Sequence, residues 1–188
     1  MELYFCISLQ RAGNTLLGSI LNQNPDITFT ANSPLTEIIY QLDLIKTNNK
    51  IPQQQNFPHH DSLDNVIRKT FYTYSETFKT KYVINRCNWG SDGNLELLEK
   101  YFDKKIKFLI LYRNPLECLA SLLKAFKVKK ENIETDADYF MHPETGVLGN
   151  VIKQIPLVQK NYEHLFITYD QLIANPQSTV NSIYNFFN

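Results

Sequence analysis

Two short segments of the sequence carry the residue types that bind phosphate or sulfate groups. The first covers residues 8–15 (SLQRAGNT). Gly13 allows a ligand to approach the backbone closely, and the side chains of Arg11, Asn14 and Thr15 can donate hydrogen bonds to it. The segment lacks the earlier glycine and the lysine of a Walker A motif. It therefore predicts an anion site unlike that of ATP-binding P-loops, with a tight turn that binds no ligand as the alternative.

The second segment begins at Arg113, directly after the apolar run 107–112. Asn114 and Pro115 form a helix-capping pair, and Ser121 lies two turns into the expected helix, about 9 Å along its axis from Pro115. A guanidinium at the strand end can fold back and share one phosphate with that hydroxyl. The alternative is a surface arginine beside an ordinary capped helix.

These segments must be positioned by a sheet. Short apolar runs at 3–7, 82–84, 107–112 and 165–169 indicate parallel strands, and helical patterns follow at 16–21, 92–102, 114–126 and 175–187. This alternation predicts an α/β fold, a doubly wound parallel sheet flanked by helices, with ligands at the carboxyl ends of the strands. The polar segments 48–62 and 127–149 are expected to be surface loops.

Composition excludes several classes of function. The 188 residues, 43% of them hydrophobic, predict one domain over residues 1–188, and 19 basic against 19 acidic residues leave no footprint for nucleic acid. Three widely spaced cysteines favour reduced, buried thiols over disulfides or a zinc site. Without a leader-like segment or an apolar stretch long enough for a membrane span, a cytoplasmic protein with no membrane partner is expected.

Together the two segments resemble the nucleotide site of the sulfotransferase superfamily. In that family a P-R-S-G-[ST]-T-like loop binds the 5′-phosphosulfate of 3′-phosphoadenosine 5′-phosphosulfate (PAPS), and R-[DN]-P with a serine eight residues after the arginine binds the 3′-phosphate. The resemblance implies a P-loop nucleoside-triphosphate-hydrolase-like fold, PAPS as the donor, and no metal. The donor-binding residues it implies are Arg11, Ala12, Gly13, Asn14, Thr15, Arg113 and Ser121.

Two weaker matches extend the resemblance over residues 5–187. Tyr169 corresponds to a tyrosine that approaches the nucleotide, and Arg86 stands where many members place a lysine near the transferring sulfuryl group. The loop also departs from the family pattern, because Gln10, Ala12 and Asn14 replace the usual proline, serine and Ser/Thr. Many members continue beyond the last helix into a segment that closes over the nucleotide, whereas this sequence ends there, so a minimal form or another cover is expected.

The resemblance implies transfer of a sulfuryl group to a hydroxyl, with Arg11 and Arg86 stabilising charge on the transferred group. Glu37, in the first turn of a helix expected from Pro34, is the first candidate for the general base, and His59 or His60 is the alternative. The acceptor remains a carbohydrate, a protein tyrosine, or a small alcohol or lipid. Trp89 is expected either in the core or in the wall of an acceptor pocket.

Two other functions are compatible with the pattern. A P-loop-type nucleotide kinase also opens with strand, anion loop and helix, although Arg113 and Ser121 have no evident task in ATP binding. A non-catalytic nucleotide-binding protein of the same fold is the second alternative, since the loop is altered.

Overall fold

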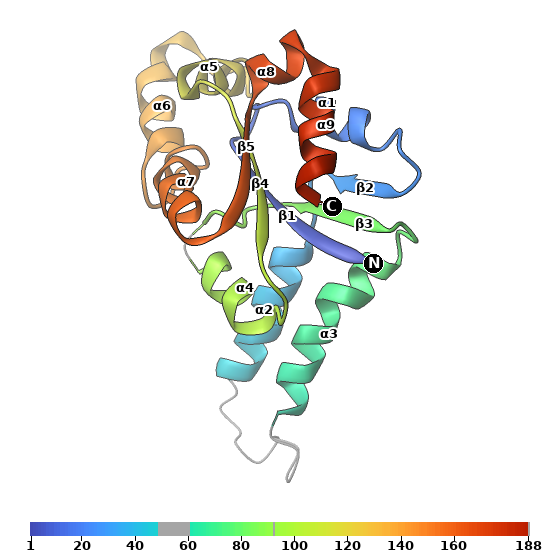
Figure 1. Ribbon diagram of the computed structural model, residues 1–188. Helices are drawn as coiled ribbons and strands as arrows, with labels where there is room; N and C mark the ends of the chain where they lie inside the picture. Colours follow the sequence, from blue (N-terminus) through green and yellow to red (C-terminus); the bar gives the residue numbers. More distant parts are fainter. Residues whose placement is uncertain (49–60, 92, 188) are drawn as a thin grey trace.

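The computed structural model describes residues 1–48, 61–91 and 93–187 (Figure 1). The strands are β1 (Glu2–Ser8), β2 (Ile27–Thr30), β3 (Tyr82–Arg86), β4 (Lys107–Tyr112) and β5 (Glu163–Thr168). The helices of the described residues are α1 (Asn14–Leu21), α2 (Leu35–Thr47), α3 (Ser62–Glu76), α4 (Asn94–Tyr101), α5 (Pro115–Ala125), the 3₁₀ helix η2 (Lys130–Asn132), α6 (Ile133–Met141), α7 (Gly149–Asn161), α8 (Tyr169–Ala174) and α9 (Pro176–Phe187). A single α/β arrangement is thereby confirmed as the fold class.

In the described residues the strands form one parallel sheet in the order β2-β3-β1-β4-β5. β1 and β4 are central and nearly all buried, as their continuous apolar runs require. Ser8 at the end of β1 is in register with Leu111, two residues before Arg113. This register brings the two predicted anion-binding segments to the same edge of the sheet.

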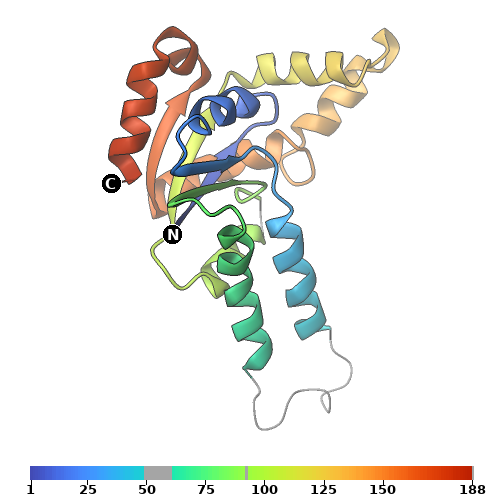
Figure 2. The same cartoon turned by 90° about the vertical axis from the view of Figure 1, so that its right-hand side faces the viewer.

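Alternate residues of β1 face the two helical layers. The ring of Tyr4 stacks on Phe187 of α9 with centroids 4.1 Å apart, whereas Phe5 faces the other layer and meets Trp89 at 4.9 Å and Phe102 at 4.9 Å. Figures 1 and 2 show α1 and α9 on one side of the sheet and α2, α3 and α4 on the other. Trp89 is fully buried, so it belongs to the core and forms no pocket wall.

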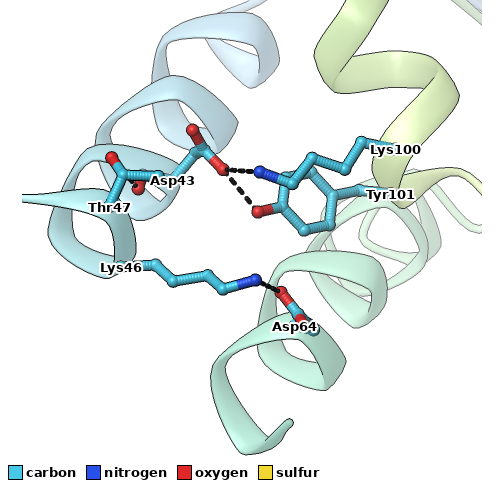
Figure 3. A network of polar contacts seen from close by, with 6 residues as sticks. All are labelled: Asp43, Lys46, Thr47, Asp64, Lys100 and Tyr101. Carbon is cyan, nitrogen blue, oxygen red and sulfur yellow. Dashed lines mark hydrogen bonds and ion pairs between the residues drawn. The ribbon is translucent and has the colours of Figure 1, made fainter.

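Polar contacts join the three helices α2, α3 and α4 (Figure 3). The Asp43 carboxylate of α2 accepts hydrogen bonds from Lys100, at 2.8 Å, and from the hydroxyl of Tyr101, both on α4. Lys46 pairs with Asp64 of α3. Burial disfavours the charged form of Asp43, but the hydrogen bonds from Lys100 and Tyr101 lower its pKa overall. The network therefore stabilises this layer at neutral pH, and acidification through the lowered pKa of Asp43 weakens it.

The structure corrects the expected elements in several places. β2 was not predicted, because four residues between an Asn-Pro stop and a helix give too short a pattern. Residues 127–149, expected as a loop, contain η2, α6 and the start of α7. α6 carries acidic residues at Glu134, Asp136 and Asp138, and only Phe140 of this helix is buried. β5 ends at Thr168, and Tyr169 begins α8. Most of the predicted loop at 48–62 lies outside the described residues.

The three cysteines are free and buried, as expected. Burial raises the pKa of Cys6 and of Cys87 to about 12, and that of Cys118 to about 11, so all three are neutral thiols at physiological pH. Within the described ranges, no helix has the length and apolar character needed to cross a membrane.

Candidate functional site

The loop after β1 ends in a left-handed turn that exposes the first backbone N–H groups of α1. Arg11 and Gly13 have φ values of 68° and 99°, and Gly13 is the N-cap of α1 without any side-chain hydrogen bond to the helix. The backbone N–H groups of the first turn of α1 are thus left free to bind a ligand, and the helix dipole favours an anion at this position. In the described residues the Thr15 hydroxyl donates to no protein group, so it is also available.

Side-chain hydrogen bonds fix the shape of this loop. Ser8 donates to the Asn14 side chain at 2.6 Å, and the Asn14 amide donates to the Leu9 carbonyl at 3.2 Å. Asn14, which we expected to offer a side-chain donor to an anion, instead uses that donor within the loop. Ser8 accepts in turn from Nε of Arg86 at 3.0 Å. The hydrogen bond from Arg86 therefore anchors the loop to β3.

Arg113 is held at the end of β4 by three contacts. Its Nε donates to Glu117 at 2.8 Å, one Nη donates to the Arg11 carbonyl at 3.2 Å, and its guanidinium lies 4.4 Å from the Tyr169 ring centroid. The hydrogen bond to Glu117 raises the pKa of Arg113. The Asn114 side chain accepts from the Leu116 N–H at 3.0 Å and caps α5, as predicted. Arg113 is thereby aimed back over the loop.

The two segments close around one pocket. Nε of Arg11 donates to the Ser121 hydroxyl at 3.0 Å, which links the loop to α5. The pocket has a volume of about 260 Å³ and is lined by Arg11, Gly13, Asn14, Thr15, Leu16, Arg113, Ser121 and Tyr169. Two guanidinium groups and a helix N-terminus meet there, so the pocket suits a ligand with more than one anionic group.

Comparison with known proteins assigns the chain to a family. The sulfotransferase domain family matches residues 3–188, almost the whole chain. The chain belongs to the sulfotransferase domain family. No match was found among curated protein sequences.

Solved sulfotransferases share the fold of this sulfotransferase domain. The sulfotransferase domain of the curacin biosynthetic pathway has a TM-score of 0.64 at 17% identity, over 99% of this chain and 73% of that one. The sulfotransferase domain of the olefin synthase from Synechococcus PCC 7002 gives 0.65 at 17%, over 98% and 72%. A mouse sulfotransferase complexed with PAP gives 0.59 at 14%, over 99% of this chain and 58% of that one. At these identities the likeness shows the fold.

Of the donor-binding residues expected in this sulfotransferase domain, the pocket brings together all but one. Ala12 is fully buried and does not line it, so only its backbone could contribute. Leu16 was not expected in the lining, because an apolar side chain at the start of a helix carries no anion-binding signal. The bond between Arg11 and Ser121 also joins residues 110 positions apart, which the sequence gives no means to foresee.

The residues expected for transfer are placed differently. Arg86 is 8% exposed, and besides Ser8 it donates to the Ala31 carbonyl at 3.4 Å. Glu37 is exposed in the first turn of α2 and accepts from Gln41 at 2.8 Å. It does not line the donor pocket. His59 and His60 lie outside the described residues, and no group of three potential metal ligands occurs within the described ones.

Gly13 and Gly93 offer a matched pair of substitutions. Both have positive φ, 99° and 79°, but a Cβ on Gly13 would lie 2.6 Å from the Tyr169 ring, whereas none of the described atoms lies within 4 Å of one on Gly93. Either alanine variant is expected to lose about 1 kcal/mol of stability through the backbone. Only Gly13→Ala must also displace Tyr169, so it should weaken binding of adenosine 3′,5′-bisphosphate by about tenfold or more. Calorimetric titration measures the affinity and thermal melting measures the stability. Equal nucleotide affinities of the two variants would contradict binding of the nucleotide beside Gly13 and Tyr169.

Proposed function

We propose that this sulfotransferase domain, a single unit over residues 1–188, transfers a sulfuryl group from PAPS to a hydroxyl group. The observation that carries the proposal is the pocket in which Arg11, Arg113 and Ser121 meet at the N-terminus of α1. A nucleotide with a phosphate at each of two ribose positions presents two anionic groups to such a pocket. A single anion would leave one guanidinium unused.

In this proposal the two ends of the pocket take different groups. The backbone N–H groups at Gly13 and Asn14, with the Thr15 hydroxyl, bind the 5′-phosphosulfate. Arg113 and Ser121 bind the 3′-phosphate, and Tyr169 flanks the nucleotide. Arg11 lies between the two, because its side chain now reaches Ser121 while its backbone is part of the loop. The cations needed to balance the ligand are thus supplied by the protein.

Transfer requires in-line attack, with charge compensation rather than covalent chemistry from the protein. The acceptor oxygen forms a bond to sulfur while the bond from sulfur to the bridging phosphate oxygen breaks. Arg11 and Arg86 stabilise the negative charge on the sulfuryl and leaving oxygens. The acceptor proton passes to Glu37. Support for this base comes from Ser33, whose N–H donates to the Arg86 carbonyl at 3.0 Å, so the chain enters α2 directly beside Arg86.

The donor is tested by thermal stabilisation. Adenosine 3′,5′-bisphosphate at 100 times its Kd should stabilise the fold by about 2.7 kcal/mol, which corresponds to a rise of several degrees in Tm. ATP with magnesium should stabilise it far less, because no 3′-phosphate engages Arg113. A scan with each nucleotide at equal concentration measures the difference. Stabilisation by ATP equal to or greater than that by the bisphosphate would overturn the proposal in favour of a kinase-like site.

A further inference from the structure

A second cavity borders the loop on another side. It has a volume of about 600 Å³, within the range of small-molecule sites, and lies between the loop after β1, η2, α6 and the end of α5. Gln10, the residue before Arg11, lines it, whereas Ser121 of the same α5 lines the donor pocket. The loop and α5 thus separate two neighbouring cavities. In Figure 2, α5 and α6 project from the sheet as a pair.

Aromatic rings form one wall of this second cavity. The Phe126 and Phe140 rings are stacked with centroids 5.6 Å apart, and the Tyr139 ring meets Phe140 at 5.6 Å. Phe126 is 65% exposed and Tyr139 60% exposed, although both are large apolar rings. Flat aromatic ligands pack favourably against such a wall.

The charged groups of the lining favour an anion. Lys127 and Lys129 lie there with one carboxylate, Asp136. Lys129 is also near Glu131, at 4.0 Å. Lys127 has neither an ion-pair nor a hydrogen-bond partner for its ammonium group among the described residues. One uncompensated cation therefore stands at the edge of the aromatic wall.

The backbone of Lys127 gives an independent reason to assign it a role. Its φ is 53°, and the N–H groups of Lys127 and Val128 donate to the carbonyls of Lys124 and Leu123 at 3.2 and 3.0 Å. These bonds define a Schellman motif at the end of α5, in which the left-handed position normally holds glycine. Lysine there is strained relative to glycine. A strained residue that lines a cavity points to a function for its side chain.

We infer that this cavity binds the acceptor, and that the acceptor is an aromatic hydroxyl compound with an anionic substituent held by Lys127. The inference rests on the proposed sulfuryl transfer and names its substrate class. The aryl oxygen attacks sulfur at the Gln10 end of the cavity and its proton passes to the base. The products are an aryl sulfate and adenosine 3′,5′-bisphosphate.

The test uses 6-hydroxy-2-naphthoate and its methyl ester as acceptors with PAPS. The two compounds share the ring and the hydroxyl and differ in the anionic group. The carboxylate should react with about two- to fivefold higher kcat/KM than the ester. Lys127→Gly should abolish this preference and at the same time raise Tm by about 1–4 °C, since it relieves the left-handed backbone. A merely structural lysine would show the stabilisation without the change in preference, which would overturn the inference.

Lys79→Gly is the matched control. Lys79 also has positive φ, 58°, and it does not line the cavity. This variant should be stabilised similarly and should keep the preference for the carboxylate. If adenosine 3′,5′-bisphosphate stabilises the protein but neither naphthol is sulfated, the acceptor inference fails while the donor site stands. If the bisphosphate has no effect, the proposed function itself fails.

Discussion

Replacement of Arg86 by methionine is expected to slow sulfuryl transfer by about 10²- to 10³-fold, and to weaken binding of adenosine 3′,5′-bisphosphate much less than that. Arg86 is a buried cation, and among the described residues no carboxylate pairs with it. Its partners are neutral oxygens of Ser8 and Ala31. A buried charge without a counterion is costly in the free protein, and an anion at the adjacent loop would relieve that cost. The relief is greatest where negative charge builds up during transfer.

Release of adenosine 3′,5′-bisphosphate from PAPS in a single turnover measures this effect, with water or an aryl alcohol as acceptor. Arg86→Lys keeps the charge but loses the forked contacts to Ser8, so an intermediate rate is expected. Arg68→Met, on the exposed face of α3, is the control and should transfer at the normal rate. A methionine variant at position 86 that transfers as fast as the unaltered protein would assign Arg86 a purely structural role.

Local pattern and parallel topology were sufficient to predict that certain residues of the candidate site come together in one pocket. Gly13, Arg113 and Ser121 were predicted because each stands at a fixed position after a buried strand, and parallel strands bring their carboxyl ends together. The pairing of Ser8 with Leu111 shows this directly, because it puts the ends of β1 and β4 side by side. Nothing comparable places Glu37, because its distance from the loop depends on the segment between β2 and α2.

Contacts between distant side chains could not be predicted. Tyr169 packs so closely on Gly13 that a Cβ there would clash, yet 155 intervening positions carry no sign of it. The Asn14 side chain could donate a hydrogen bond to an anion, but its amide donates to the Leu9 carbonyl instead. The second cavity depends on α6, whose acidic first half resembles a surface loop and of which only Phe140 is buried. Each of these features is decided by packing, which periodicity does not report.

Replacement of Arg113 by alanine is expected to remove the preference for a 3′-phosphate. Affinity for adenosine 3′,5′-bisphosphate should fall by about 30-fold or more, as expected for the loss of charge-assisted hydrogen bonds, whereas adenosine 5′-monophosphate should bind nearly as before. Titration calorimetry with the two nucleotides gives the ratio of affinities. An unchanged ratio in the alanine variant would mean that Arg113 only supports the Arg11 carbonyl and the Tyr169 ring.

A substitution at Glu117 can distinguish an Arg113 that binds the 3′-phosphate from one that only supports neighbouring groups. Glu117 competes with the phosphate for the Arg113 guanidinium. It accepts from Arg113 at 2.8 Å, and its side chain is 52% exposed. Glu117→Gln removes the negative charge beside the pocket but leaves a group that can still accept a hydrogen bond from Arg113. If Arg113 binds the 3′-phosphate, this variant should bind adenosine 3′,5′-bisphosphate more tightly, by about two- to fivefold, since repulsion from the carboxylate is lost. Substitutions of two residues that contact each other, Arg113 and Glu117, would then change the affinity for the bisphosphate in opposite directions, which a supporting role for Arg113 does not produce.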